Sequence, residues 1–402
     1  MKNKKKDDRV IKTLLTIVAT AIITVVVTTI YIYSVEYNNV GSVIGNSAKD
    51  AALDAKLSII KDKIDDKYIG EVNESELIEG AIKGYVAGLN DVYTEYFPKS
   101  DMEDYMDETK GEYVGIGVYI TKDEKNNQIL IYGTMENSPA KEAGLQTGDI
   151  LVSVNDEECD GDDYETITTK IKGDDGTKVK LGVIRNNENL TIEVKRKKIE
   201  VQHVTSQILE ENIGYIYLSS FEGNGAKQFE EAYDNLNSKG IKSLIIDVRN
   251  NGGGIVKEAL NIADLMTKKG ETLLIEEDKN GAEVVEKAKK DKKITMPIVL
   301  LVNEYSASAS EILAGILKEK VDNATIVGNT TYGKGVIQTL YTLTDGSGLK
   351  ITTNEYFTPE HNKINKVGIE PDEKVTDYLY KGTLELDKDT QLKKAIEILK
   401  TK

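Results

Sequence analysis

An uncharged stretch near the N-terminus constrains this chain more than any other feature. No residue from Thr13 to Val35 is charged, and its apolar part, Leu14–Tyr33, is 20 residues long. About that many residues are needed for an α-helix to cross a hydrocarbon core of ~30 Å. Basic residues dominate before the stretch, which indicates an N-terminus in the cytoplasm. We therefore expect a cytoplasmic tail over 1–12, a transmembrane anchor over 13–35 and a folded part outside the cytoplasm.

A cleaved signal peptide is the alternative for this stretch. Signal peptides usually have a shorter apolar core, of ~7–15 residues, followed by an A-x-A-like cleavage site. Here the apolar stretch is longer and no such site is clear. The sequence therefore favours a single-pass protein of the cell membrane with an uncleaved anchor.

Composition argues against several classes of protein. The chain of 402 residues has 68 acidic and 52 basic residues, a net charge of −16. Nucleic acid is not an expected partner, because binding a polyanion requires a basic face. The single cysteine, Cys159, excludes a disulfide within the chain and a multi-cysteine metal site. The two histidines, His203 and His361, argue against a His-rich metal centre and a Ser-His triad.

Two amphipathic helices are predicted directly after the anchor, over residues 49–64 and 75–89, in an N-terminal helical segment spanning 46–108. Each has one apolar face. These faces can pack on the main body of the chain or on a second copy of themselves. A short amphipathic helix is also predicted at Gln391–Lys402, within a C-terminal segment spanning 381–402. We expect a homodimer, if one forms, to use these N- and C-terminal helices.

The remaining sequence predicts an α+β and α/β multidomain protein. From Gly111 the apolar period changes to two, and we expect a compact β-rich domain over 109–198 with two short helices. From Ile199 strands and helices alternate, and several strands are continuously apolar, as in a buried parallel sheet. This predicts an α/β domain over 199–380 with an antiparallel hairpin near its end. The charged stretch Glu276–Lys293 is predicted to be a solvated helix or excursion.

A serine-rich turn is the first candidate for chemistry. Asn303–Ile312 follows a buried strand and precedes a helix, so Ser308 lies where open α/β sheets bind ligands. The backbone N–H of Ala309, at the helix start, can stabilise an oxyanion. Ser308-Ala309-Ser310-Glu311 also has the pattern of an N-terminal capping box, which is a purely structural role. This segment alone does not decide between them.

A lysine supplies the base that the histidines do not. Lys334 lies 26 residues after Ser308 in the run Thr331–Gln338, between small glycines. Burial lowers the pKa of a lysine, and a neutral amine can take a proton from a serine. In a strand, Lys334 and Gln338 lie on one face, so Gln338 can orient the amine. A surface lysine in a tight turn is the alternative.

Two glycine loops offer backbone N–H groups. Asp247–Gly254 ends in three glycines after a buried strand, and an N–H from this loop can join that of Ala309 in an oxyanion hole. The second loop, Tyr113–Val118, can bind a terminal carboxylate with its N–H groups while the strand edge pairs with a peptide. Each loop can also be a simple turn.

Taken together, these segments resemble the C-terminal processing peptidases, also called tail-specific proteases. Asn137–Leu151 resembles the PDZ domain embedded in that family, and the similarity runs from about Ala48 to Val375. The resemblance implies a serine endopeptidase without metal or nucleotide, acting on protein or peptide substrates with free C-termini. It implies that Ser308 is the nucleophile, Lys334 the base and Gln338 its orienter. It also implies oxyanion donors at Gly253 and Ala309, and peptide binding by Gly115, Ile116, Gly117 and Val118.

Three departures from the family pattern are visible. Gly252 stands where the family usually has a proline, and the interval from Ser308 to Lys334 is one residue longer than usual. The turn Pro359–Lys363 lacks the usual glycines. None of them removes a catalytic group. The rival interpretation is a peptide-binding scaffold with an inert site, and the joint presence of serine, lysine and glutamine argues against it.

Overall fold

The computed structural model describes residues 48–376 and 388–401. The predicted anchor over 13–35 therefore lies outside the described residues. Among the described residues, no helix is both long enough and apolar enough to cross a membrane. The chain forms two compact units, Met1–Gly80 and Ala81–Lys402.

The described part of the first unit contains α2 (Ala48–Lys67) and the beginning of α3 (Glu74–Ala87), both predicted from their apolar periodicity. An ion pair of 3.0 Å joins Lys61 to Glu74 within this unit. The predicted apolar face of α2 is exposed at Leu53 and Leu57. Within the part of the unit that the structure describes, these side chains are not covered.

The second unit begins with short elements that lead into a small β domain. They are β1 (Glu95–Phe97), α4 (Lys99–Lys110) and β2 (Glu112–Gly115). The domain's sheet has the order β3-β4-β5-β7-β8, with a small strand β6 paired to β5. The bounds are β3 Val118–Asp123, β4 Gln128–Thr134, α5 Pro139–Glu142, β5 Ile150–Val154, β6 Glu157–Glu158, η1 Gly161–Asp163, α6 Tyr164–Ile171, β7 Lys178–Arg185 and β8 Glu188–Lys195.

The sequence pattern explains this domain's core. Alternate side chains of the strands point inward, as the period of two predicts, and Ile129, Leu151 and Val183 are almost completely buried. Helices α5 and α6 contribute Ala140, Ile167 and Ile171 to this core. The chain enters and leaves through the ribbon of β2 and β9 (Lys197–Glu200). Because β3 is an edge strand of the sheet, its outer backbone edge is available for pairing.

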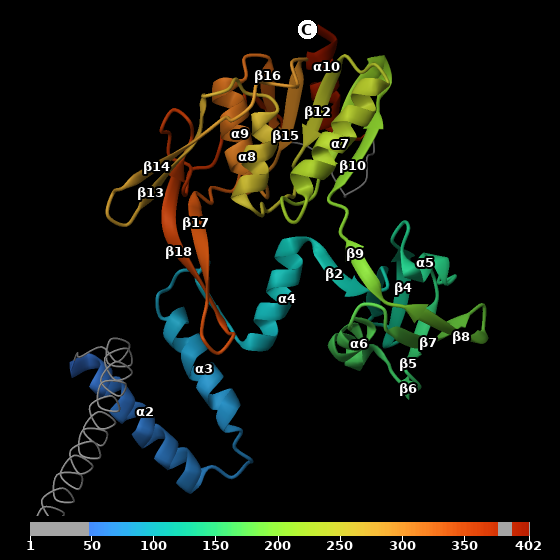
Figure 1. Ribbon diagram of the computed structural model, residues 1–402, viewed down its shortest axis with the longest axis vertical. Coiled ribbons are helices and arrows are strands. Elements are labelled where there is room, and N and C mark those ends of the chain that lie inside the picture. The colour runs from blue at the N-terminus through green and yellow to red at the C-terminus, as the bar shows by residue number, and fades with distance from the viewer. Residues whose placement is uncertain (1–47, 377–387, 402) are drawn as a thin grey trace, which may run out of the picture. The chain divides into compact units, whose positions relative to one another are not determined.

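The larger domain is built on a six-stranded sheet of order β10-β11-β12-β15-β16-β19 (Figure 1). Strand β10 is antiparallel to β11, and the other neighbours are parallel. The bounds are β10 Val204–Ile208, η2 Glu210–Asn212, β11 Ile213–Leu218, α7 Gly225–Ser238, β12 Ser243–Asp247, α8 Val256–Asp264, β15 Ile298–Val302, α9 Ala309–Lys320, β16 Ala324–Gly328, β19 Glu373–Lys374 and α10 Thr390–Thr401.

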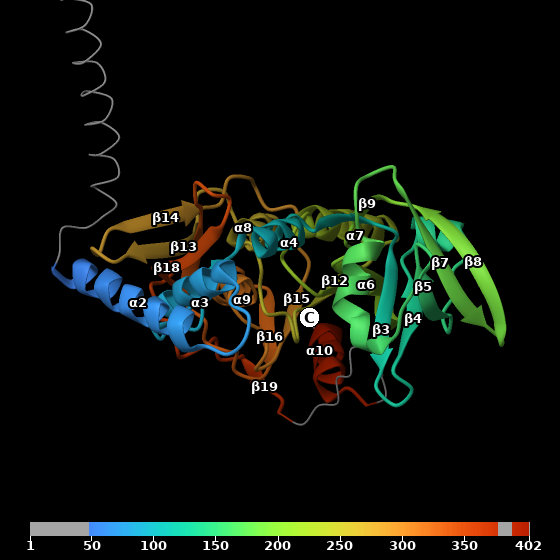
Figure 2. The same ribbon diagram turned by 90° about the horizontal axis from the view of Figure 1, so that it is seen from below.

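Helices cover both faces of this sheet. Leu244 and Ile246 of β12 pack in the core that includes α7, α8 and α9, whereas Ile245 packs in the core that includes α10. Figure 2 shows α10 on the face opposite to α7. The predicted C-terminal helix therefore buries its apolar face against its own chain, through Leu392, Ala395, Ile396 and Leu399. This explains why the central strands read as continuous apolar runs.

A second, antiparallel sheet carries the predicted hairpin. It contains β13 (Thr272–Asp278), β14 (Glu283–Lys287), β17 (Val336–Thr342) and β18 (Gly348–Phe357), with β1 paired to β18. The helical alternative for Glu276–Lys293 is wrong, because this stretch forms part of the β13–β14 hairpin. Its charged side chains fit a strand since the hairpin is largely solvated on its β14 side.

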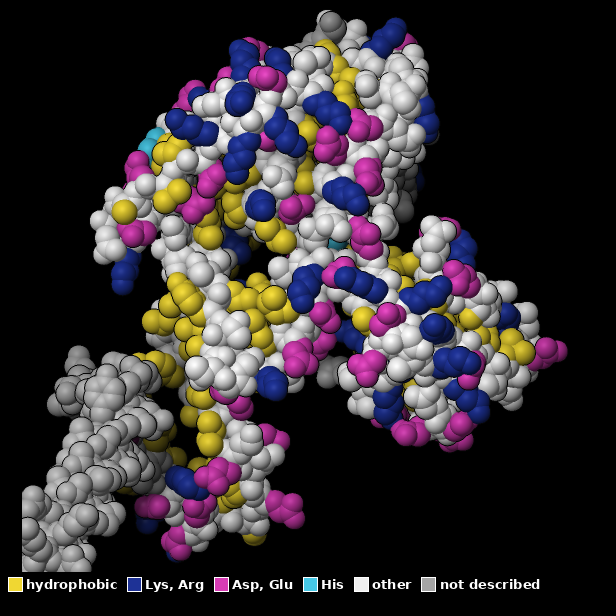
Figure 3. Space-filling model, viewed as in Figure 1, with side chains coloured by type: hydrophobic (Ala, Val, Ile, Leu, Met, Phe, Trp, Pro, Cys, Tyr) yellow, Lys and Arg dark blue, Asp and Glu magenta, His cyan; other side chains and the backbone are white. Residues whose placement is uncertain are grey.

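Acidic and basic side chains are interspersed on the surface of this unit. The face in Figure 3 shows Lys and Arg beside Asp and Glu on both the small β domain and the larger domain. Many of them form exposed ion pairs, such as Lys178–Glu193 at 2.6 Å. Such exposed pairs add little to stability, typically ~0–1 kcal/mol each.

Candidate active site

Ser308 lies at the turn between β15 and α9. It is the N-cap residue of α9, and its backbone has φ 54° and ψ −115°. A non-glycine residue with positive φ is strained and persists only where its surroundings hold it. Ser308 is 9% exposed, so the turn presents it at the surface of a cavity. The capping interpretation and the catalytic interpretation therefore apply to the same residue.

The glycine loop after β12 packs directly against this serine. Gly253 has φ 112°, and a Cβ there would lie 2.8 Å from Cβ of Ser308. Glycine is therefore required at this position by both backbone conformation and space. The Gly253 N–H donates to Oδ1 of Asn251 at 2.9 Å. In this structure that predicted oxyanion donor is consequently engaged within its own loop.

Lys334 shares the cavity with Ser308. Its Nζ lies 4.4 Å from the centroid of the Tyr93 ring, and the Tyr356 hydroxyl donates to its carbonyl oxygen. Burial lowers the pKa of Lys334, Lys350 lowers it further, and the carboxylates of Asp91 and Glu311 partly oppose this. A lysine held in this way gives up its proton more easily than one in water.

No hydrogen bond joins Ser308 Oγ to Lys334 Nζ in this structure, although both residues are described. Gln338 also faces elsewhere, since its Nε2 donates to Thr352 Oγ1 at 3.2 Å. A register shift between Ile337 and Gln338 breaks the regular alternation of β17. Strand β17 begins only at Val336, so the prediction that Lys334 and Gln338 share one face of a regular strand is wrong, although both line the same cavity.

Glu311 connects the serine turn to the lysine loop. Its carboxylate is fully buried and accepts the N–H groups of Ser308 at 2.9 Å and Lys334 at 2.8 Å. It also accepts from the Gly333 N–H and the Thr331 hydroxyl, both at 2.6 Å. Burial raises the pKa of Glu311, and these hydrogen bonds oppose the rise. The sequence indicated Glu311 only as part of a capping box; its contact with the lysine loop depends on tertiary structure.

The cavity itself has a volume of about 520 Å³. Its lining combines the serine turn, the lysine strand, the glycine loop and the region around β1, including Gly252, Gly254, Tyr93 and Lys350. Both histidines are described, and neither lines it. His203 is buried, which lowers its pKa, and His361 is exposed and pairs with Glu283 at 2.8 Å.

The second glycine loop lines a separate cavity of about 570 Å³ in the same unit. Gly115, Ile116, Gly117 and Val118 all border it, together with residues of α6. Gly117 has φ 75°, and a Cβ there would lie 2.4 Å from Cβ of Ser138. The loop leads directly into the edge strand β3. An added peptide strand can therefore pair with β3 while its end approaches the loop.

Three family descriptions match the chain: Peptidase family S41 over residues 212–375, PDZ domain over 130–185, and Activating protease CtpB N-terminal domain over 28–101. The carboxy-terminal processing protease CtpA of Bacillus subtilis is 35% identical over 353 residues, which are 86% of this chain and 75% of that protein. A probable CtpA-like serine protease of Staphylococcus saprophyticus is 34% identical over 330 residues. That match covers 81% of this chain and 66% of the staphylococcal protein.

Among solved structures, a photosystem II D1 C-terminal processing protease is 28% identical to this chain. The match covers 80% of this chain and 86% of that one, with a TM-score of 0.47.

Proposed function

The chain belongs to the C-terminal processing peptidase family, and we propose that it is a membrane-anchored serine endopeptidase acting outside the cytoplasm. Its PDZ domain recognises the C-terminal end of a protein substrate, and the peptidase domain cleaves near that end. One observation carries the proposal: the serine turn and the lysine loop share a cavity and are tied together by Glu311. An inert peptide-binding scaffold would not need this link.

The proposed reaction is acyl transfer to Ser308. The neutral amine of Lys334 takes the Oγ proton as Oγ attacks the scissile carbonyl carbon. The Ala309 N–H and an N–H of the glycine loop stabilise the oxyanion of the tetrahedral intermediate. The amine then gives the proton to the departing nitrogen, and water hydrolyses the acyl-enzyme. Gln338 orients the amine when it turns from Thr352 toward Lys334.

Two groups that this reaction uses have other partners in the structure. Lys334 Nζ lies over the Tyr93 ring, and the Gly253 N–H is held by Asn251. Catalysis therefore requires the amine to move to Ser308. It also requires Gly253 to turn its N–H into the cavity, or a neighbouring glycine to supply the donor.

A serine-reactive fluorophosphonate probe tests the function. We expect it to label the full-length protein, and the Ser308→Ala variant to lose both labelling and peptide hydrolysis. Ser206→Ala is the control, because Ser206 is exposed in β10 and does not line the cavity. If Ser308→Ala is labelled as well as wild type, the scaffold interpretation replaces the enzyme.

The membrane anchor is a separate part of the proposal. Its support is the uncharged stretch Thr13–Val35 with basic residues before it. Fractionation should place the protein in membranes, and intact cells should expose the peptidase domain to an external protease. N-terminal sequencing of the mature protein that begins beyond Val35 would show cleavage and contradict the anchor.

We also propose a homodimer through the N-terminal helices. Leu53 and Leu57 of α2 are exposed, whereas α10 covers its own apolar face within the chain. Among the described residues of the predicted interface, the exposed apolar side chains therefore lie in its N-terminal part. Sedimentation of the detergent-solubilised protein should give a dimer, and Leu53→Glu with Leu57→Glu a monomer. A monomeric wild type would refute it.

A further inference from the structure

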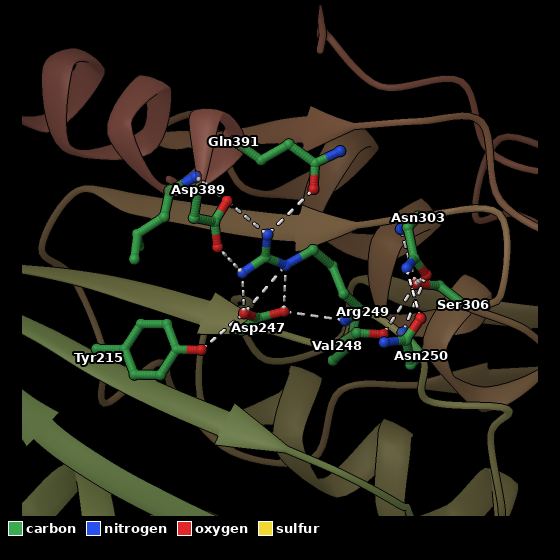
Figure 4. A network of polar contacts seen from close by, with 10 residues as sticks. Tyr215, Asp247, Val248, Arg249, Asn250, Asn303, Ser306, Asp389 and Gln391 are labelled. Atoms are coloured by element: carbon green, nitrogen blue, oxygen red, sulfur yellow. Dashed lines mark hydrogen bonds and ion pairs between the residues drawn. The ribbon is translucent and has the colours of Figure 1, made fainter. Parts of the chain in front are cut away.

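The segment before α10 reaches the base of the glycine loop. There Arg249 is completely buried, and its guanidinium lies between two carboxylates from distant parts of the chain (Figure 4). Asp247 ends β12, and Asp389 follows 140 residues after Arg249. This joins the C-terminal segment to a loop that borders the active-site cavity.

The contacts around the guanidinium are short and numerous. Arg249 Nη2 donates to Asp247 Oδ2 at 2.6 Å and pairs with Asp389 Oδ2 at 2.7 Å. Nη1 donates to Asp389 Oδ1 at 2.9 Å and to Gln391 Oε1 at 3.2 Å. Burial alone would lower the pKa of Arg249, but the two carboxylates raise it above its ordinary value. A buried cation is stable only with such partners.

The position of Arg249 is transmitted to the glycine loop by the next two residues. Asn250 has φ 60°, and its N–H donates to Oδ1 of Asn303 at 2.9 Å. The carbonyl of Asn251 accepts from the Ala307 N–H at 3.1 Å and from the Ser310 hydroxyl at 2.9 Å. The start of the glycine loop is thus fixed between Arg249 and the serine turn.

We propose that Asp389 is a positioning residue for the oxyanion-binding loop and acts through Arg249, an inference that rests on the proposed function. Asp389 Oδ1 also accepts the Leu392 N–H at 3.0 Å, so the same carboxylate caps α10. Docking of the C-terminal helix and placement of the loop therefore depend on one side chain. Without this carboxylate, Arg249 loses one of the two charged partners described around it and can shift with the loop attached to it.

The variant Asp389→Asn tests this inference most directly. Asparagine is a good N-cap and keeps an acceptor for the Leu392 N–H, so α10 stays capped while the charge is lost. Glu210→Gln is the matched control. Glu210 pairs with Lys400 of α10 at 3.0 Å, so this variant also removes an acidic partner of that helix. That ion pair has no contact with Arg249.

The measurement is kcat and KM on an internally quenched peptide with a free apolar C-terminus, with thermal melts of each variant. Loss of a whole oxyanion donor costs ~10²–10³-fold in kcat, so a displaced loop should cost roughly tenfold or more. We expect this fall for Asp389→Asn with KM nearly unchanged, and a parallel loss of affinity for a peptide boronate. Glu210→Gln should keep the wild-type kcat.

Three results would overturn the inference. The first is a wild-type kcat in folded Asp389→Asn, and the second is a loss that vanishes when variants are compared equally far below their melting temperatures. The third is an undiminished effect of Asp389→Asn in an Arg249→Lys background. If the wild type itself shows no Ser308-dependent hydrolysis, the proposed function fails instead, which separates the two failures.

Discussion

The backbone N–H groups of Ser308 and Lys334 donate to the same atom, Oε2 of Glu311, at 2.9 and 2.8 Å. One buried carboxylate thus fixes the distance between the segment that carries the nucleophile and the segment that carries the base. The main chains of the serine and lysine segments are therefore held together, although no hydrogen bond joins Lys334 Nζ to Ser308 Oγ.

Glu311→Gln should therefore impair catalysis despite its similar shape. Both carboxylate oxygens accept two donors each, so the amide NH₂ of glutamine must face at least one N–H or O–H group. An unsatisfied buried donor costs about 1–3 kcal/mol. We expect a lower melting temperature and at least tenfold slower probe labelling of Ser308, from roughly one or two such losses.

Glu319→Gln provides the control for this variant, because Glu319 lies near the other end of α9 and outside the cavity. It should label at the wild-type rate. Equal labelling of the wild type and Glu311→Gln would mean that the bridge does not set the active-site geometry.

Lys334→Ala should abolish hydrolysis while leaving folding and PDZ binding unchanged. Loss of a general base typically costs ~10²–10⁴-fold, and more where the nucleophile depends on it. Single-turnover hydrolysis measures the loss, and binding of a fluorescent peptide to the PDZ domain serves as the control. Activity within a few-fold of wild type would remove Lys334 from the mechanism.

The pH dependence of kcat/KM should report the pKa of Lys334. The protonated amine cannot accept the Ser308 proton, so activity rises with pH as this group deprotonates. Lys350 lowers that pKa and Asp91 raises it. We expect Lys350→Met to move the acid limb to higher pH and Asp91→Asn to move it to lower pH.

Two controls accompany this pH experiment. Lys350→Arg keeps the positive charge, so the acid limb of its kcat/KM profile should stay near that of the wild type. His203→Gln and His361→Gln should leave the limb in place. If either histidine variant removes the limb, an imidazole and not Lys334 is the base.

Periodicity predicted most of the fold, because strands and helices here follow local patterns. Strands and helices alternate in the larger domain as predicted, for example in β11, α7 and β12. The hairpin β13–β14 was not predicted as strands, since its charged residues resemble a solvated helix and pairing across it depends on β18. Helix α4 was missed because its composition is strongly polar.

In the candidate site, sequence patterns predict the residues of the motifs but not the contacts that depend on tertiary structure. Ser308 and Lys334 belong to motifs, so the sequence named them and the fold brings them to one cavity. The Gly253 N–H and the Gln338 amide point to other partners, which depends on a loop conformation and a register shift. Asp389 and Arg249 meet across 140 residues, and no local pattern predicts that contact. The missing glycines of Pro359–Lys363 do have a visible effect, because His361 must adopt φ 65°.

Peptide binding in the cavity beside the second glycine loop should be separable from catalysis at Ser308. Gly115 and Gly117 frame the loop whose N–H groups are proposed to hold the substrate's terminal carboxylate. A Cβ at Gly117 would lie 2.4 Å from Ser138, so Gly117→Val should distort the loop and weaken peptide binding. A small probe should still label Ser308 in this variant, because the cavity that contains Ser308 does not include the loop around Gly117.

Amidation of the substrate's C-terminus tests the same contact without any change to the protein. A carboxylate gains charge-assisted hydrogen bonds of ~1.5–3 kcal/mol each, so its loss should weaken recognition roughly tenfold or more. Competition between free-acid and amidated forms of one peptide measures this directly, and an internal sequence change that preserves the C-terminus is the control. If the amidated peptide is cleaved as fast as the free acid, the PDZ domain does not read the C-terminal carboxylate, and substrates are selected by another part of the chain.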